Sequence, residues 1–459
     1  MMLVDSLPFL MLGALAILLF SGLPVAIILG GIGVAACLIG IALDEMPWAA
    51  LYSIVPKMIY AVSGTPFYPA VVMLLFMGVA LEKSGIAHDM LACLRLVFKK
   101  IPGGLAIAVL IIGVLVAPAA GVVGASVVTL SMIALPTMLA NGYRASAATG
   151  VVAAAGTVGI IMPPAVMLFF LSGKFQVPIG SMFMATVIPG VILIGCYMLY
   201  YAVQGWFNGP AMRRADTADS EAQATSPTGW ALLLLRGLVM PVALLSLILG
   251  AIISGWATPS QAGGVGAAGG LVLVIFSGRL SWPLFKDLIR TTSNLAAMVF
   301  FIIMSAAVFS YPFRYFGGDS AIQDGLNQLS TGPWPTLLLI LAIIFLLGFF
   351  IDWIEITVIT LPIFVPILGG LDFAAHANSA PATMLWMAAV IALVLQTSFL
   401  TPPFGFALFF LKGSAPPTVK LSDIYIGIVP ILVLQLCVIT LVLSFPVLTS
   451  WLPELVYGK

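Results

Sequence analysis

Two carboxylates stand in one of the most apolar parts of the chain. Asp352 and Glu355 are separated by two residues and are flanked by Phe349 and Phe350 on one side and by Trp353 between them. Ionised side chains are costly in apolar surroundings and usually mark an ion pathway there. The same Asp-x-x-Glu spacing suits the start of a helix, with Asp as the N-cap and Glu reaching back. The two roles are compatible, so we expect this pair to cap a helix and to take part in cation binding.

Glycine, hydroxyl and amide residues accompany these carboxylates and recur in the first half of the chain. Backbone, hydroxyl and carboxylate oxygens are the ligands that a hard cation such as Na⁺ prefers. The first predicted cation cluster consists of Gly121, Gly124, Ser126, Gly156, Thr157 and Gly159. The second consists of Asp352, Glu355, Thr357, Gln396, Thr397, Ser398 and Thr401. The competing interpretation is that the glycines only allow close helix packing and that each hydroxyl bonds the carbonyl one turn back.

A repeated double proline indicates which elements position these clusters. Pro163-Pro164 precedes a Leu-Phe-Phe-Leu run, and Pro402-Pro403 precedes a second one at the matching place in the other half of the chain. A double proline breaks a helix, because each Pro removes an amide donor and its ring clashes with the preceding turn. Two interrupted apolar helices at matching places in two halves are typical of the binding site of a secondary transporter.

The composition is that of a polytopic α-helical membrane protein. Hydrophobic residues make up 62% of the chain and charged residues 7%, against about 25% charged in soluble domains. Apolar runs long enough to cross a bilayer recur throughout. The net charge of +1 and the absence of a basic stripe argue against a nucleic-acid partner. The cysteines and histidines show no metal-ligand spacing, and no catalytic or ATP-binding motif occurs. We therefore expect no catalytic residue, metal site or cofactor.

The first half of the chain predicts a scaffold followed by a repeat. Residues 1–46 are expected to form N-terminal transmembrane helices, and residues 47–206 the first repeat. Small residues and a proline over 117–126 predict a non-helical tip between two short apolar arms, giving a re-entrant hairpin near 105–140. A single kinked helix is the alternative for this stretch. The broken helix is expected near 145–173, unwound around Gly156 to Gly159.

The second half repeats this plan after a polar linker at 207–228. Within residues 229–459 we expect a hairpin near 336–368 and a broken helix near 383–413. Thr258, Pro259 and Gln261 also predict a helix start, with Thr as the N-cap and Gln reaching back. The predicted fold is therefore an all-α polytopic membrane protein with two inverted structural repeats and a site near the middle of the bilayer.

Five short motifs, in order along the whole chain, resemble one protein family. They are Glu-Lys-Ser-Gly-Ile-Ala at 82–87, Ile-Pro-Gly-Gly at 101–104, Gly-Thr-Val-Gly-Ile-Ile-Met-Pro-Pro at 156–164, Ala-Thr-Pro at 257–259 and Leu-Thr-Pro-Pro at 400–403. Together they resemble the large membrane (M) subunit of tripartite ATP-independent periplasmic (TRAP) transporters. The stretch 349–357, Phe-Phe-Ile-Asp-Trp-Ile-Glu-Ile-Thr, resembles the mannitol/chloroaromatic-type branch.

The resemblance implies a Na⁺-coupled importer of small organic acids in the bacterial inner membrane, using an elevator-like movement. It also implies two protein partners, a small membrane (Q) subunit and a periplasmic substrate-binding protein (P subunit). The chain begins directly with the large-subunit pattern, so a separate Q subunit is expected. Ala165 stands where the family commonly has Ser after the first double proline, and the first hairpin tip is poorer in serine. Both departures leave the ligands of the first cation site open.

Other function classes remain as alternatives. The main one is a self-sufficient Na⁺/dicarboxylate symporter of related fold, which would need no binding protein. An ATP-driven permease would need an ATPase partner and would respond to ATP depletion. An intramembrane enzyme would need a buried histidine or facing catalytic carboxylates, and His88 and His376 lie near predicted loops. The described pattern of paired helix breaks favours the carrier.

Overall fold

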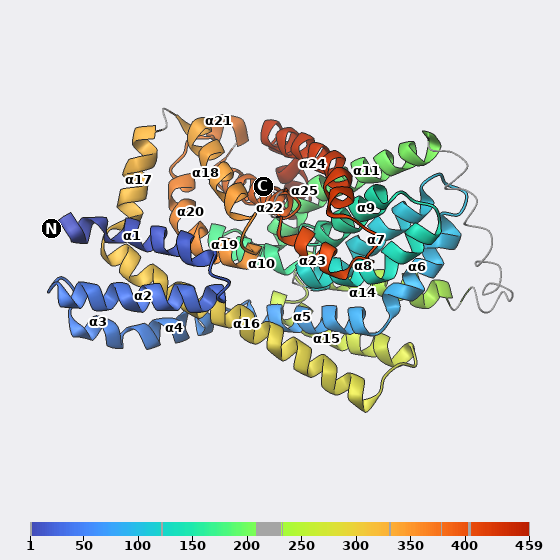
Figure 1. The fold of residues 1–459 in the computed structure, drawn as a ribbon, viewed down its shortest axis with the longest axis horizontal. Helices are drawn as coiled ribbons and strands as arrows, with labels where there is room; N and C mark the ends of the chain where they lie inside the picture. The colour runs from blue at the N-terminus through green and yellow to red at the C-terminus, as the bar shows by residue number, and fades with distance from the viewer. Residues whose placement is uncertain are drawn as a thin grey trace.

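The computed structural model describes residues 2–120, 123–207, 231, 233–329, 332–377, 379–402 and 405–458. Regular structure in these ranges is helical, from α1 (Met2–Leu19) to α25 (Val447–Tyr457) (Figure 1). Eight of the helices are long and apolar enough to cross a membrane, and a bent pair, 48–63 with 68–83, makes a possible ninth span. The prediction of an all-α polytopic membrane protein is confirmed.

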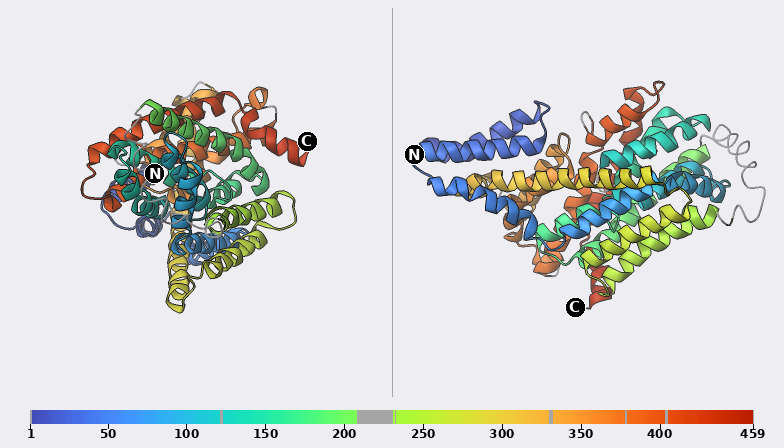
Figure 2. Two further views of the ribbon diagram at one scale, coloured as in Figure 1. Left: turned by 90° about the vertical axis from the view of Figure 1, so that its right-hand side faces the viewer. Right: turned by 90° about the horizontal axis from the view of Figure 1, so that it is seen from below.

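Four long helices form a layer along the lower side of the molecule in Figure 1, which we call the scaffold layer. In it, α2 (Val25–Ala42) runs along α16 (Trp282–Tyr315), and α5 (Tyr68–Lys83) runs along α15 (Pro259–Phe276). α5 also contacts α16, which joins the two pairs, and the view from below in Figure 2 shows the layer face-on. The packing of α1 against α2 extends this layer at one end.

A glycine sets the closest approach within the scaffold layer. A Cβ atom at Gly33 of α2 would lie 2.5 Å from the carbonyl oxygen of Val308 and 2.9 Å from the amide nitrogen of Phe309, both in α16. Only a residue without a side chain allows two helix backbones to come this close. At Gly31, two residues away, a Cβ would meet no atom within 4 Å.

Helix starts in this layer follow local signals, whereas helix lengths do not. Thr258 and Gln261 form the predicted capping box at the start of α15, with bonds of 3.3 and 2.8 Å. α16, by contrast, has 34 residues, many more than its apolar part alone. At 1.5 Å per residue it is about 50 Å long, well beyond the ~30 Å hydrocarbon core. Its charged first part therefore continues the helix outside the apolar span.

A short amphipathic segment precedes α5. It consists of α3 (Trp48–Tyr52) and α4 (Ile54–Ser63), and it meets α5 at an angle of 61°. Within these two helices only Ala50 and Ile54 are buried. A helix inclined in this way, with one narrow buried face, is suited to the membrane interface rather than to a full crossing.

The first repeat contains the expected hairpin and broken helix. Its helices are α6 (Ile86–Val97), α7 (Gly104–Ala120), α8 (Val123–Ala140), α9 (Ala145–Val158), α10 (Val166–Phe175) and α11 (Ile179–Phe207). The expectation of a non-helical tip over 117–126 is wrong, because α7 continues to Ala120 and α8 begins at Val123. Alanine has the highest helix propensity, and this stretch is rich in it.

The second repeat follows the same order. The predicted linker, 207–228, falls almost wholly outside the described residues. Beyond it the chain forms a π-helical turn, η2 (Leu235–Val239), and then α14 (Met240–Ile253). Beyond the scaffold helices come α17 (Gly318–Leu329), α18 (Pro333–Leu347), α19 (Trp353–Ile359), α20 (Leu361–Gly369), α21 (Ala374–Ala377), α22 (Ala380–Ser398), α23 (Phe406–Ser414), α24 (Leu421–Ser444) and α25. The second arm of this hairpin is thus divided into α19 and α20, and α25 is an addition that the sequence did not predict.

The two repeats are packed into each other rather than side by side. Each hairpin contacts the broken helix of its own repeat: α7 and α8 lie on α9, and α18 and α20 lie on α22. Each hairpin also contacts the other repeat, because α8 packs on α23 while α19 and α20 pack on α10. Likewise α9 packs on α24 and α22 on α11. We call this exchange the reciprocal hairpin packing, and it is the pattern expected of two inverted repeats.

Candidate functional site

The first helix break lies between α9 and α10. α9 ends at Val158, α10 begins at Val166, and Pro163 and Pro164 stand between them, joined by a cis peptide bond. The N-cap residue of α10 is Ala165, which provides no side-chain cap. The first amide groups of α10 therefore lack a side-chain partner, and uncapped helix N-termini attract negative charge.

Gly156 and Thr157 belong to the last turn of α9 rather than to the expected unwound segment. Thr157 donates a hydrogen bond to the carbonyl of Ala153 at 3.0 Å, as a helical residue does, and the chain leaves the helix only at Gly159. A Cβ at Gly156 would lie 2.5 Å from Cγ2 and 3.0 Å from Cα of Val127. The glycine therefore allows α8 to pack directly on α9.

The tip of the first hairpin divides its contacts between the two repeats. Ser126 is 4% exposed and lies one residue before the contact of α8 with Gly156. Gly124 faces the second repeat instead, since a Cβ there would lie 2.7 Å from the ring of Phe410 in α23. Gly121 lies outside the described residues. The structure thus brings Val127, the neighbour of Ser126, to Gly156 and places Gly124 at the contact between the repeats.

The second helix break lies between α22 and α23. α22 ends at Ser398 and α23 begins at Phe406, with Pro402 in the break. Pro403 lies outside the described residues. The N-cap residue of α23 is Gly405, which likewise offers no side-chain cap. The two breaks are therefore alike: each ends in a helix whose first amide groups have no side-chain acceptor.

The hydroxyl groups at the second break bond carbonyls within their own segment. Thr397 donates to Leu393 at 2.8 Å, Ser398 to Leu395 at 2.7 Å and Thr401 to Thr397 at 2.9 Å. This is the back-bonding that the competing interpretation expects. A hydroxyl that donates its proton still carries lone pairs on its oxygen. The geometry is consequently compatible with both interpretations, because each oxygen can still accept or coordinate.

Gln396 differs from its neighbours in having no partner. Its side chain is 0% exposed, and neither Oε1 nor Nε2 has a hydrogen-bond partner among the described residues. A buried polar group without a partner costs about 1–3 kcal/mol. Native proteins keep such groups where they serve a ligand or a functional step. Gln396 is therefore the strongest ligand candidate at the second break.

Asp352 and Glu355 form the predicted cap at the start of α19. The amide of Trp353 donates to Asp352 Oδ1 at 2.7 Å, and the amide of Asp352 donates to Glu355 Oε2 at 3.0 Å. Asp352 is 7% exposed. Thr357, one turn on, donates to the carbonyl of Trp353 at 2.6 Å. The pair thus fixes the first turn of α19 and holds two carboxyl groups within the packed interior.

The second hairpin touches both helix breaks. α19 packs on α10 and α16, and the Trp353 ring lies 5.4 Å from the Phe170 ring in an edge-to-face arrangement. At the end of α18, a Cβ on Gly348 would overlap the side chain of Ser398. The tip of this hairpin therefore reaches the second break through Gly348, while the carboxylate pair is placed towards the helix that follows the first break.

Two polar contacts join the hairpins to the scaffold layer, one in each repeat. At the end of α5, Glu82 accepts a hydrogen bond from Thr129 of α8. At the end of α16, Arg314 Nη2 donates to the carbonyl of Pro362 in α20 at 3.1 Å. In both repeats the last turn of a scaffold helix therefore holds the second arm of its own hairpin. We call these two contacts the scaffold–hairpin bonds.

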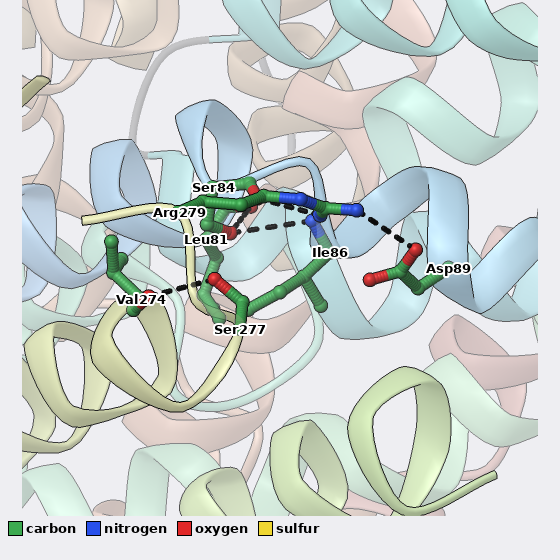
Figure 3. A network of polar contacts seen from close by, with 7 residues as sticks. All are labelled: Leu81, Ser84, Ile86, Asp89, Val274, Ser277 and Arg279. Carbon is green, nitrogen blue, oxygen red and sulfur yellow. Dashed lines mark hydrogen bonds and ion pairs between the residues drawn. The ribbon is translucent and has the colours of Figure 1, made fainter. Parts of the chain in front are cut away.

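The turn after α5 is fastened to the scaffold layer by charged side chains. Lys83 contacts Asp287 at 2.5 Å and Thr291 at 2.7 Å, both in α16. Figure 3 shows Arg279, from the α15–α16 connection, reaching the carbonyl of Ser84 at 2.8 Å and Asp89 at 3.1 Å. The polar residues of the Glu-Lys-Ser-Gly motif are thus structural.

Sequence reasoning missed two polar residues near the site. The indole Nε1 of Trp353 is buried without a partner among the described residues, and it lies beside Asp352. Glu82 was noticed only as part of a motif. The available signals were an indole next to a carboxylate in an apolar tip, and a carboxylate at the end of an apolar helix, where unpaired charge is rare.

Comparison with known families gives one match over nearly the whole chain. Residues 12–448 match the family described as "Tripartite ATP-independent periplasmic transporter, DctM component". The chain is 27% identical over 397 residues to the C4-dicarboxylate TRAP transporter large permease protein DctM of Pseudomonas aeruginosa, covering 86% of each chain. It is 26% identical over 448 residues to the isethionate TRAP transporter permease protein DctMQ of Oleidesulfovibrio alaskensis, covering 96% of this chain and 66% of that relative.

A third relative and two solved structures agree with this. The sialic acid TRAP transporter large permease protein SiaM of Vibrio cholerae is 27% identical over 321 residues, covering 69% of each chain. The YdaH transporter of Alcanivorax borkumensis superposes with a TM-score of 0.58 at 16% identity, covering 89% of this chain and 90% of that one. MtrF of Neisseria gonorrhoeae superposes with a TM-score of 0.54 at 15% identity, covering 90% of this chain and 85% of that one. At such identities the superpositions support the fold alone.

Proposed function

Because the chain belongs to the DctM component family of tripartite ATP-independent periplasmic transporters, we propose that it is the Na⁺-coupled large permease subunit of a binding-protein-dependent importer of small organic acids. The family fixes the coarser part: a multi-pass inner-membrane permease of a secondary transporter, and not an enzyme. The coupling ion, the substrate and the partner proteins are the proposed part. The unpartnered buried amide of Gln396 at the second break is the observation that carries the proposed Na⁺ coupling.

The second break supports cation coupling. Gln396 offers an amide oxygen, and the hydroxyl oxygens of Thr397 and Thr401 keep lone pairs after donating their protons. These are oxygen ligands of the kind that a hard cation takes. Asp352 and Glu355, on the hairpin that also reaches this break, would supply the negative charge. We propose Na⁺ as the coupling ion and no other cofactor.

The starts of α10 and α23 support an anionic substrate. Both helices begin inside the protein after a break, and both begin without a side-chain cap. Val166 and Ala407, in their first turns, are buried at 2% and 0% exposure. The amides of Ala407 and Leu168 donate to the backbone carbonyls of Phe399 and Ala165, so the helix dipole is what favours a carboxylate at such positions. Three relatives are named as transporters of C4-dicarboxylates, sialic acid and isethionate, which are all organic acids or their anions.

The proposed partners follow from the family. We propose that a periplasmic binding protein delivers the substrate and that a small membrane subunit packs against the scaffold layer. The hairpins and broken helices, which the reciprocal hairpin packing joins into one body, would move against that layer in an elevator-like step. A self-sufficient Na⁺/dicarboxylate symporter would use the same body without a binding protein.

Uptake into proteoliposomes tests the proposal. The vesicles contain this chain and its small subunit, with an inward Na⁺ gradient or a choline gradient of equal osmolarity. Radiolabelled organic acids are added free or loaded on the binding protein. We expect uptake only with Na⁺ and the loaded binding protein. Uptake of free substrate with Na⁺ would establish the self-sufficient symporter instead, and equal uptake in the choline gradient would refute Na⁺ coupling.

A further inference from the structure

A pocket lies between the amphipathic helix α4 and the end of the scaffold helix α16, away from both helix breaks. Its volume is about 460 Å³. Its walls are mostly cationic, aromatic or hydroxyl-bearing side chains, namely Lys57, Ala307, Ser310, Tyr311, Arg314 and Tyr315. In the described part of the chain no carboxylate lines it. Nothing in the proposed transport function uses this pocket.

The pocket carries net positive charge. Lys57 Nζ lies 3.9 Å from the centre of the Tyr311 ring and has no ion pair among the described residues. The charge of Arg314 is already compensated, because its Nε lies 3.2 Å from the carboxylate of Asp319, and its Nη2 donates to the carbonyl of Pro362. One of the two cations is thus held over an aromatic face with its charge uncompensated. Such an arrangement favours an anion with several acceptor oxygens.

The surroundings place this pocket at the membrane interface. α3 and α4 turn an apolar and aromatic surface outward, where Trp48 is 63% exposed, Tyr52 76% and Tyr60 75%. Trp and Tyr gather where the hydrocarbon meets the headgroups. α4 also meets α5 at 61°, so it lies inclined along the membrane rather than across it. Exposed Val55 and Ile59 add apolar surface on α4.

We propose that this pocket binds the phosphate headgroup of an anionic phospholipid, with Lys57 as the main contact and the exposed face of α4 in contact with the acyl chains. The positive charge of the pocket and the apolar surface on α4 both fit such a lipid. A free phosphate ester would use only the positive charge and would leave the apolar surface uncovered. The bound lipid bridges α4 and α16, and therefore fastens the amphipathic segment to the scaffold layer.

A matched lysine allows a sharp test. Lys286 lies 5.3 Å from the centre of the Trp282 ring at the opposite end of α16, outside the pocket. Lys57→Ala and Lys286→Ala therefore remove the same charge from the same kind of contact. Binding of phosphatidylglycerol and of phosphatidylcholine, with identical acyl chains, is measured by native mass spectrometry of the purified full chain. Glycerol phosphate is added as a competitor without acyl chains.

We expect phosphatidylglycerol to be retained over phosphatidylcholine, and Lys57→Ala to weaken that retention by about fivefold, the usual effect of one interfacial cation. Lys57→Arg should restore it, which separates charge from misfolding. Lys286→Ala should leave it unchanged. Equal retention of the two lipids, or an equal loss in Lys286→Ala, would overturn the headgroup site. Displacement by millimolar glycerol phosphate would overturn the lipid as its occupant.

Discussion

Replacing Gln396 by Leu separates a ligand role from a packing role. The side chain is wholly buried, and neither polar atom of its amide has a partner in the part of the chain that the structure describes. Leu is close to Gln in size but carries no polar group. If the amide exists to bind Na⁺, its removal should stabilise the Na⁺-free protein and abolish the response to Na⁺.

The two effects have calculable sizes. Removing an unsatisfied buried amide should raise the free energy of unfolding by about 2 kcal/mol, within the usual 1–3 kcal/mol range. Na⁺ at one hundred times its dissociation constant stabilises the wild type by about 2.7 kcal/mol. Gln396→Leu should therefore be the more stable protein without Na⁺ and slightly the less stable one at saturating Na⁺. The order of the two proteins reverses as Na⁺ is added.

Thermal denaturation in detergent measures this reversal. Tryptophan fluorescence reports the midpoint in NaCl and in choline chloride at equal ionic strength. Gln435→Leu is the control, since Gln435 is 1% exposed on α24 and its amide lies beside the buried hydroxyl of Tyr197. The control should keep its full response to Na⁺, whatever its midpoint in choline chloride.

Two results would contradict this reasoning. If Gln396→Leu keeps the full Na⁺ response, the cation site lies elsewhere. If Gln396→Leu is destabilised in both salts, the amide of Gln396 has a structural role in the wild type. Uptake under an Na⁺ gradient then gives a second readout, because only the loss of a ligand should abolish transport in a protein that is more stable than the wild type.

Three further changes follow from the packing. Gly33→Ala should lower the free energy of unfolding by about 1–3 kcal/mol, since its Cβ would meet the backbone at Val308, whereas Gly31→Ala, with open space around it, should not; equal thermal midpoints would contradict the close contact. Asp352→Asn should weaken the Na⁺ dependence of uptake while the protein still folds, because a neutral side chain can still accept the capping bond from the backbone; an unchanged Na⁺ dependence would remove this residue from the site. Thr129→Val removes the donor of one scaffold–hairpin bond and should speed amide hydrogen exchange across α8; unchanged protection would show that the bond does not hold the hairpin.

Local features of the fold were predictable from the sequence. The caps at Thr258 and Asp352 depend on residues three positions apart, so their residue types were enough. The interruption of both broken helices follows from proline chemistry and needs no tertiary information. These are also the features that fix where the candidate site begins and ends along the chain.

Lengths and partners of helices were not predictable in the same way. The charged residues Lys286, Asp287 and Arg290 lie outside the apolar part of α16, yet helix geometry tolerates them, and the helix includes them all. Gly124 resembled a cation ligand by its neighbours in the sequence, but it faces Phe410 of the other repeat. No local pattern records which distant helix a glycine will meet. The lack of a partner at Gln396 is likewise visible only once every neighbour is placed.

The reciprocal hairpin packing bears on the ancestry of the chain. Neither repeat covers its own hairpin completely, since α8 of the first repeat also packs on α23 of the second, and α19 and α20 of the second also pack on α10 of the first. A single ancestral repeat would have exposed these surfaces until a second copy, inserted in the opposite orientation, covered them. Gene duplication would then have joined two subunits that were already a dimer. On this view the two halves, expressed from separate genes, should still assemble, because buried surface rather than peptide continuity holds them together.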